Sequence, residues 1–582
     1  MKRKYPVATL LLSLLAAGCG GSDVDSPPAA PGEYTAVPNP ELVPVQGYEA
    51  DVMEPFVSRD GRYLFFNNMG TNKDIFFATR DDLSGAFIYT DVITAINTPA
   101  VEGVPTLDDD NRFYYISTFN YPPSGAQILD AFVYHNYDLA GQPGSGRLGK
   151  QVVSWGESTF IQGGINVINP VDVPAFRAPG AELKDALLPV EMFYASAGVT
   201  ENITLETFVQ ADWEPVKPDD CGTFFSTNDF AADGCGPVLL AGQLPDSQAF
   251  AQGFIAPRLG DEEADSKDQF GVAMRWYVPA LNDSELGFYY IKYNSRLPYV
   301  SGQVNDPSNG VSFPSYFIEY PENIDLYGIS INTTTPGGWS LGAEYSFRPN
   351  LPLQWNAFEL IYGGLQLQNP ETGGNASLLQ DQREAEAGGA DLSGQKVDGY
   401  DRFKVSQAQF TLIKFFDQVM GASRLSLITE FGATYIHDLP DEDEGRFGRS
   451  GTFGIGELPG GACGGTGANG VALNINTNYC NNEGFTTDFS WGYRARFVWD
   501  YPNVFAGINL RPQLAWSHDV EGYSPQPGGA FNEGSKAVGL SLEAIYQNKI
   551  TGNISYTNFF DGKPYNELTD RDFATVSVSY SF

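Results

Sequence analysis

A repeated alternation of apolar and polar residues constrains the fold of this chain more than any other feature. Residues 268–278, 339–347, 487–499 and 536–546 each place apolar side chains at every second position, with small or polar side chains between them. Because successive side chains of a strand point to opposite faces, this period predicts β-strands. The strands extend over about 10–15 residues, which is long for the sheet of a soluble protein.

The alternating strands predict an all-β chain whose main part is a transmembrane antiparallel β-barrel. In such a barrel the apolar face contacts lipid, the polar face lines the lumen, and aromatic side chains gather at both interfaces. Aromatic residues cluster at the strand ends of this sequence. The alternative is a secreted soluble β protein, in which the apolar face packs against a second sheet.

The connections between the predicted strands alternate between short and long, as do the periplasmic turns and external loops of outer-membrane barrels. The expected short turns are 200–202, 280–283, 347–352, 500–503 and 547–549, and the expected long loops are about 214–267, 366–401, 439–486, 520–534 and 561–570. Residues 333–338 do not fit, because they are short where a long loop is expected. With 111–119 as an added strand, we expect about 18 strands, within a range of roughly 16 to 20.

The N-terminus predicts export. Residues 1–18 combine a basic start with a short apolar run, as a secretory signal peptide does. Residues 16–19, AAGC, resemble a bacterial lipobox, which implies lipidation of Cys19, and the alternative is an ordinary signal peptide. Residues 19–45 are rich in Pro, Gly and Ser and predict a flexible tether. We therefore expect an outer-membrane protein whose N-terminus is periplasmic.

Charge and composition narrow the possible partners. The net charge of −37 argues against nucleic acid, which requires a basic face. We expect no enzyme, because the sequence has no G-x-S-x-G motif and only three histidines. We also expect no cofactor and no metal, since the acidic runs 261–263 and 441–444 lack the spacing of a calcium loop. The remaining cysteines predict two local disulfides in external loops, Cys221–Cys235 and Cys463–Cys480.

The last nine residues, ATVSVSYSF, alternate up to the C-terminal phenylalanine. They resemble the C-terminal signal of bacterial outer-membrane barrels, which the barrel-assembly machinery binds. The resemblance implies that Tyr580 and Phe582 belong to an assembly signal, with Phe582 facing outer-membrane lipid.

A block in the first half of the chain carries a family resemblance. Its pieces are RLG (147–149), WGES (155–158), GIN (164–166), NPVD (169–172), PGAELK (179–184) and CGT (221–223) with Cys235. They resemble the outer-membrane family known as domain of unknown function 1302, over roughly residues 126–582, and 121–582 is the expected barrel domain. The resemblance implies an outer-membrane barrel that handles lipids, sphingoid bases or steroids. It also implies an RND-type exporter and a periplasmic protein as partners.

Residues 46–120 depart from that family. Residues 54–80 and 102–118 resemble blades of a TolB-type propeller, with Ser58, Asp60 and Gly61 before an aromatic strand. Propellers contain four to eight blades, so the region is expected to be a propeller fragment of short β-strands. The alternative is that four of its segments are barrel strands, namely 62–68, 74–80, 86–92 and 111–119.

Isolated charges fall on the polar faces of the predicted strands. Mixed signs predict internal ion pairs that narrow the lumen, whereas a ring of one sign would indicate an ion-selective porin. The expected lumen charges are Glu206, Arg275, Glu344, Glu430, Arg494, Arg496, Arg511 and Glu543.

Residues 155–189 begin at the external side but are too apolar for a solvent-exposed loop. Irregular backbone cannot face lipid, because its amides would remain unpaired. We therefore expect this segment to fold inward as a constriction, with a short helix near 181–187. Trp155, Phe160 and Phe176 are expected to contact a hydrophobic ligand. The alternative is a cap folded over the rim.

Together these features predict an outer-membrane barrel that moves hydrophobic or amphipathic molecules across the bacterial envelope. The alternatives are a structural or adhesive surface barrel without transport, and a general porin.

Overall fold

The computed structural model of the protein describes residues 45–48, 53–58, 61–67, 75–80, 85–92, 101–107, 113–118, 130–174, 186–240, 244–461 and 477–581. Within these ranges the strands form five sheets. None of the helices in these ranges combines the length and the apolarity needed to span a membrane.

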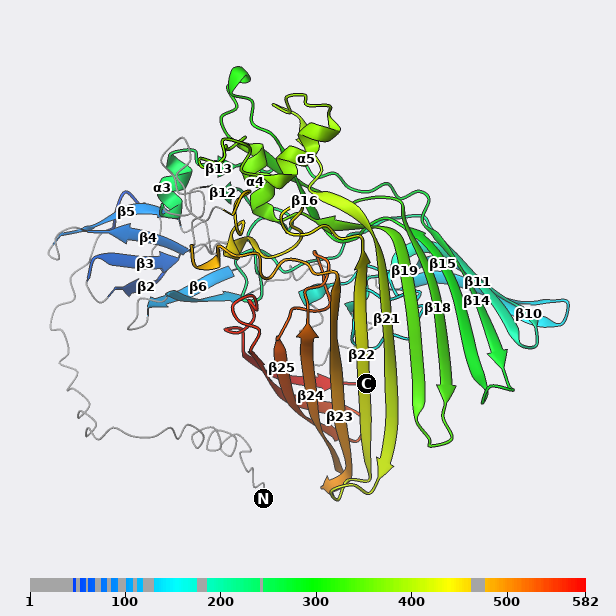
Figure 1. The fold of residues 1–582 in the computed structure, drawn as a ribbon. Helices are drawn as coiled ribbons and strands as arrows, with labels where there is room; N and C mark the ends of the chain where they lie inside the picture. The colour runs from blue at the N-terminus through cyan, green and yellow to red at the C-terminus, as the bar shows by residue number, and fades with distance from the viewer. Residues whose placement is uncertain are drawn as a thin grey trace, which may run out of the picture.

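One antiparallel sheet of 15 strands, which we call the wall, forms the main body of the described chain. Each wall strand pairs with the wall strands before and after it in the sequence, and Figure 1 shows the wall as a curved surface. The strands are β8 (Ala131–Leu139), β9 (Gln142–Gln151), β10 (Val190–Thr200), β11 (Ile203–Gln210), β14 (Phe270–Val278), β15 (Ser284–Tyr293), β18 (Ile324–Thr334), β19 (Ser340–Gln354), β21 (Tyr400–Asp417), β22 (Arg424–His437), β23 (Phe489–Phe505), β24 (Ile508–Glu521), β25 (Lys536–Tyr546), β26 (Ile550–Phe560) and β27 (Phe573–Tyr580).

Short turns join the wall strands at one end, and long loops join them at the other. The short turns are 140–141, 201–202, 279–283, 335–339, 418–423, 506–507 and 547–549, and the long loops are 152–189, 211–269, 294–323, 355–399, 438–488, 522–535 and 561–572. The predicted alternation of short and long connections is therefore confirmed among the wall strands, although not every predicted turn is in the place expected. Residues 335–339, which broke the predicted pattern, belong to the short-turn end.

The described wall has fewer strands than the 18 or so expected from the sequence. Residues 347–352 are not a turn but lie inside β19, where the register shifts between Arg348 and Leu351. A bulge leaves residues unpaired and can therefore accommodate proline, which cannot donate to the ladder. The turn expected at 500–503 likewise lies inside β23, next to a register shift.

Because the number of wall strands is odd, the edge strands β8 and β27 run in the same direction. β8 begins at the long-loop end, and β27 finishes at the short-turn end. Residues 111–119 do not supply the expected additional strand. Instead β7 (Phe113–Thr118) pairs with β6 (Val101–Leu107) in a separate two-stranded sheet.

The N-terminal strands form a sheet of their own and do not pair with the wall strands in the structure. Four strands make an antiparallel meander, and β1 pairs with β5 in parallel. A propeller blade also contains four strands, and the propeller assignment stays a prediction. The strands are β1 (Val45–Gln46), β2 (Met53–Val57), β3 (Tyr63–Asn67), β4 (Ile75–Thr79) and β5 (Phe87–Val92).

The wall exposes apolar side chains on one face and buries polar side chains on the other. Exposed apolar residues include Val272, Ile329, Leu540, Val578 and Tyr580, and buried polar residues include Ser330, Glu344, Gln409, Glu430 and Thr434. A water-soluble protein has the reverse arrangement. The inversion confirms the predicted strand faces and is expected of a wall that contacts lipid. Phe582 lies outside the described residues, as does Cys19.

Loops at the long-loop end fold into a cap of short elements (Figure 1). Helix α4 begins after Asn356, whose side-chain oxygen accepts a hydrogen bond from Phe358 N, and α5 begins after Ser377, which caps Gln380 N. The cap strands are β12 (Val238–Leu239), β13 (Ile255–Ala256), β16 (Tyr299–Gln303), β17 (Ser315–Glu319) and β20 (Lys396–Val397), and the helices are α3 (Asp246–Ala251), α4 (Ala357–Gly364), α5 (Leu378–Glu386) and the 3-10 turns η2 (Pro307–Asn309), η3 (Gly451–Phe453) and η4 (Thr477–Tyr479).

The predicted disulfide Cys221–Cys235 is confirmed and lies in the long loop 211–269. Cys480 is also disulfide-bonded. Cys463, its predicted partner, lies outside the described residues.

Leu540 and Ser541 provide a matched test of the lipid-facing side of the wall. Leu540 is 55% exposed, whereas Ser541 points to the other face, where its hydroxyl contacts Asn553. We expect Leu540→Arg to destabilise the folded protein by about 2–4 kcal/mol, because a charge near the bilayer midplane is costly. Ser541→Arg should cost much less. Urea unfolding in phospholipid vesicles measures both, and equal losses would contradict a lipid-facing apolar side.

Glu319 makes the stability of the cap depend on pH. Burial raises the pKa of its carboxyl from 4.5 to about 7, with Asp398 and Glu262 adding to the shift, and Ser301 donates an opposing hydrogen bond. The native state therefore holds this proton more tightly than the unfolded state. Its stabilising contribution is complete below pH 4.5 and is lost as the pH rises through 7.

We expect the amides of β16 and β17 to exchange more slowly in Glu319→Gln than in the wild type at pH 8. The expected difference corresponds to about 3 kcal/mol in the free energy of opening the cap, and at pH 4.5 the two proteins should exchange at similar rates. Glu263→Gln is the control, because Glu263 is exposed in the same surface hollow. Equal protection of the wild-type cap at both pH values would contradict this prediction.

Candidate functional site

The long loop after β9 turns back against the polar face of the wall. We call residues 152–174 the inner segment. Its backbone and side chains contact residues of β11, β18, β19, β21 and β22, far from it in sequence. The expectation of an inward-folded segment is confirmed by these contacts. Phe176 and residues 181–185 of the expected helix lie outside the described residues.

Glu430 on β22 binds the turn at the tip of the inner segment. Its carboxylate accepts hydrogen bonds from three consecutive backbone amides, those of Thr159 (2.8 Å), Phe160 (2.5 Å) and Ile161 (2.8 Å). The Glu430 side chain is fully buried. The carboxylate thereby satisfies three backbone N–H groups that would otherwise be buried without partners.

Glu344 on β19 holds the segment on both sides of that turn. Its carboxylate accepts from the amides of Glu157 (2.5 Å) and Ile165 (2.9 Å), and from Gln409 Nε2 (2.7 Å). Glu344 is the fifth residue of β19, so the segment reaches close to the short-turn end. A Cβ on Gly164 would lie 1.9 Å from Glu344 Oε1, so this close approach requires glycine.

Arg348 and Gln407 bind the carbonyls of the same turn. Arg348 Nη2 donates to Gly163 O (2.6 Å) and Gly164 O (2.5 Å), and Gln407 Nε2 donates to Gln162 O (2.6 Å). The bulge of β19 follows Arg348 directly. The wall thus supplies acceptors for the amides of the segment and donors for its carbonyls.

Trp155 is part of a hydrophobic core between the inner segment and β10–β18. Its ring contacts Phe208 and Tyr289, and its Nε1 donates to Glu206 Oε2 at 2.7 Å. Ile165 and Ile168 are buried in the same core. Only 2% of Trp155 is exposed, so the residue anchors the segment, and its contact with a ligand stays a prediction.

The predicted lumen charges form ion pairs only in part. Arg275 lies 2.8 Å from both Glu206 and Glu285, as the mixed signs predicted. Arg511 lies 2.8 Å from Asp500 and 3.5 Å from Glu543.

The remaining predicted lumen charges do not form ion pairs with one another. Arg494 lies opposite Glu430 in register but pairs with Asp519 at 2.6 Å, and it donates to Ala530 O in the loop 522–535. Arg496 donates to Gln513. Glu344 and Glu430 bind backbone amides because the irregular inner segment leaves those donors without partners in a ladder.

A cavity of about 410 Å³ lies between the inner segment, the wall and the loop 522–535. Its volume is within the range of small-molecule sites. Phe160 is the only one of the three expected ligand contacts that lines it among the described residues. Most other lining side chains are apolar, including Ile161, Val167, Val171, Leu187, Leu297, Ile324, Leu351 and Val405.

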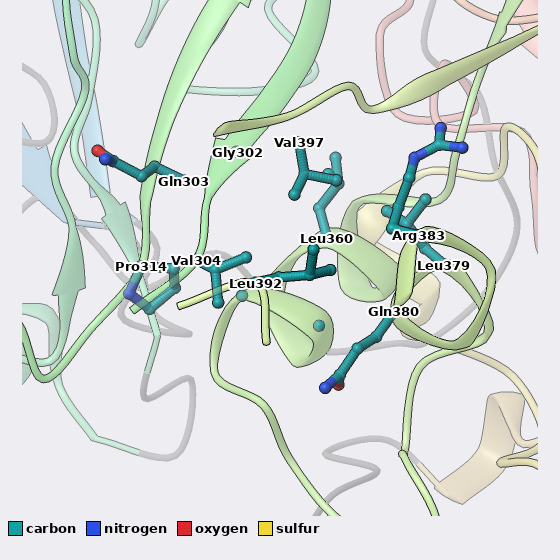
Figure 2. A pocket seen from close by; sticks show the side chains of 12 residues that line it. Gly302, Gln303, Val304, Pro314, Leu360, Leu379, Gln380, Arg383, Leu392 and Val397 are labelled. Atoms are coloured by element: carbon teal, nitrogen blue, oxygen red, sulfur yellow. The ribbon is translucent and has the colours of Figure 1, made fainter. Parts of the chain in front are cut away.

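A second hollow lies in the cap and is too small for a ligand. Figure 2 shows Leu360, Leu379 and Leu392 pointing into it, with Arg383 and Gln380 at its margin. Its volume is about 30 Å³, which is room for about one water molecule. The cap hollow is therefore a packing gap between α4, α5 and β16.

An apolar outer face, alternation of short turns and long loops, and an inner segment held on the polar face define a membrane β-barrel with an inward-folded segment. The chain belongs to the family described as Protein of unknown function (DUF1302), whose family model matches residues 98–582. The match begins earlier than residue 126 and includes β6 and β7, which the sequence placed with the propeller-like region.

Three solved structures are similar over most of the chain. They are the outer-membrane channel DcaP of Acinetobacter baumannii (8% identity, 86% of each chain covered, TM-score 0.26), OpdK of Pseudomonas aeruginosa with vanillate (9%, 89% of this chain and 90% of that chain, 0.28) and OccD3 (OpdP) of Pseudomonas aeruginosa (11%, 89% and 84%, 0.29). No curated protein matches the sequence. Because these TM-scores are all below 0.5, the functional inference depends on the geometry of this chain.

Several residues of the site were missed from sequence. Arg348 was placed in a turn, and the prolines that follow it concealed the bulge. Gln407 and Gln409 alternate with apolar residues on β21, so the period of two predicts that they lie on the polar face. It does not predict their hydrogen bonds at the inner segment. Arg296 follows β15 and had no periodic signal.

Removing the charge of Glu430 tests how the inner segment is held. We expect Glu430→Gln to weaken attachment of the segment by about 1.5–3 kcal/mol, the usual value of hydrogen bonds to a charged group. Compared with the wild type, the variant should be cleaved more readily by protease within residues 157–167, and its single-channel current should fluctuate more. Glu543→Gln is the matched control, because Glu543 is a lumen carboxylate that pairs with Arg511 instead. Equal protease resistance of Glu430→Gln and wild type would contradict the assigned role.

Proposed function

We propose that this protein is an outer-membrane channel that moves hydrophobic or amphipathic molecules, of lipid, sphingoid or steroid type, across the bacterial envelope. The observation that carries the proposal is the cavity of about 410 Å³ on the inner side of the wall, lined mainly by apolar side chains. Polar lumen residues alone would suit water and ions. An apolar cavity inside a barrel instead favours ligands that leave water readily.

The inner segment supports a gated pathway rather than an open pore. Its tip is held by hydrogen bonds, and it packs through Trp155, Ile165 and Ile168 against β10–β18. Hydrogen bonds within a buried network strengthen one another, so the contacts of Glu430 and Glu344 hold the tip cooperatively. A ligand that displaces Phe160 could therefore move the tip without unfolding the wall.

We propose that the short turns face the periplasm and the long loops face outward, as in other outer-membrane barrels. With this orientation the chain enters β8 from the outer side. A periplasmic N-terminus then requires one further membrane crossing before β8. Epitope tags in the exposed loop 371–374 and in the turn 547–549, probed on intact cells, test the orientation directly.

Replacing residues 158–167 with a short Gly-Ser linker tests the transport proposal. We expect the single-channel conductance to rise severalfold, because the constriction is removed, and binding of the neutral fluorophore N-phenylnaphthylamine to fall. A Gly-Ser replacement of 371–374, an exposed loop of the cap, is the control. An assembled barrel with unchanged conductance and unchanged fluorophore binding would refute both the constriction and the cavity as a ligand site.

A further inference from the structure

The charge of the cavity differs from that of the whole protein. The chain has 71 acidic and 34 basic residues. The residues that line the cavity nevertheless include two arginines, Arg296 and Arg348, and no aspartate, glutamate, lysine or histidine. The cavity is therefore a local positive site in an acidic protein.

Both arginines are buried, and neither forms an ion pair with a carboxylate of the described residues. Arg296 is 6% exposed and Arg348 is 3% exposed. Arg296 donates to Glu214 O, Ile168 O and Gln210 Oε1, all of which are neutral acceptors. Arg348 donates to Tyr293 Oη, Ser346 Oγ and two glycine carbonyls. Buried charges without a counter-ion are costly.

The carboxylates of Glu214 and Asp212 favour the charge of Arg296 but form no ion pair with it. Glu214 pairs with Lys150 at 3.0 Å, and Asp212 accepts a hydrogen bond from Trp213 N. Glu344 is occupied by two backbone amides and Gln409. Burial lowers the pKa of Arg296 to about 10, so it remains charged at neutral pH.

Both arginines also have N–H groups that donate to no acceptor among the described residues. A guanidinium has five N–H groups, and Arg296 makes three hydrogen bonds from its two Nη atoms. Its Nε is buried with no acceptor among the described residues. Arg348 makes four hydrogen bonds to described residues. Arg296 Nε has almost no accessible surface, so a ligand oxygen in the cavity would accept from Nη groups of the two arginines.

We propose that the cavity binds an amphipathic anion, with an acidic head group at Arg296 and Arg348 and an apolar body against Phe160, Ile324 and Leu351. This inference rests on the proposed function and specifies its ligand class. It narrows the proposed ligands, because two buried arginines without a paired carboxylate among the described residues would repel cationic amphiphiles, including long-chain amines of the sphingoid-base type. The shared chemistry is an anionic head group, carboxylate or phosphate, on an apolar body.

Head-group competition tests the inference on the wild-type protein. The full chain in nanodiscs binds N-phenylnaphthylamine, which is displaced by dodecanoate, dodecyl phosphate, dodecanol or dodecylamine, with protein-free nanodiscs as the blank. We expect at least one anion to displace the fluorophore at about a tenfold lower concentration than dodecanol, which corresponds to one charge-assisted hydrogen bond. The two anions distinguish a free fatty acid from a phosphate-headed lipid.

Variants then identify the groups responsible. Arg348→Gln and Arg296→Gln should each remove most of the preference for the anion over dodecanol, and Arg348→Lys should keep part of it. Arg511→Gln is the control, because Arg511 is a lumen arginine that pairs with Asp500 and does not line the cavity. A glutamine variant that fails to fold leaves the wild-type competition as the deciding measurement.

The outcomes separate this inference from the proposed function. Equal displacement by dodecanol and the anions, or stronger displacement by dodecylamine, overturns the anion preference and leaves an apolar site. Failure of all four competitors, or no binding of the fluorophore, overturns the proposed function at this cavity as well. Retained anion preference in both glutamine variants overturns the assignment to Arg296 and Arg348.

Discussion

The buried carboxylate of Glu430, bound to three successive amides, is the interaction on which the interior of this barrel depends. An irregular chain inside a membrane protein has backbone groups that neither lipid nor a strand ladder can satisfy. Glu430 and Glu344 accept five of these amides between them, and Arg348 and Gln407 serve the carbonyls. Without them each buried orphan group would cost about 1–3 kcal/mol.

The fixed inner segment provides one side of the hydrophobic core, and the wall provides the other. A barrel exposes its apolar side chains to lipid, so its core must be assembled on the inner face. Trp155, Ile165 and Ile168 provide that core against β10–β18, where the wall contributes small or apolar side chains such as Ala273 and Ile291. The same fixed segment leaves the cavity on its other side, where the loop 522–535 also lines it.

The bulge of β19 links the architecture to the site. It follows Arg348, whose guanidinium joins the inner segment to the cavity lining. The positive group buried at this place donates to neutral oxygens. In the proposed anion site, Arg348 would serve both the structure and the ligand, so a ligand bound to it would also act on the tip of the segment.

The sequence alone determined the strand faces, the alternation of turns and loops, the Cys221–Cys235 disulfide and the inward path of the segment. Each of these follows from local periodicity, spacing or the cost of exposing an apolar stretch. The tertiary structure decided the partners of Glu344 and Glu430, the bulge at Arg348 and the burial of Trp155. These depend on contacts between residues far apart in the chain, such as Gly164 with Glu344, and a pattern with a period of two contains no information about which strand positions lie opposite an irregular segment.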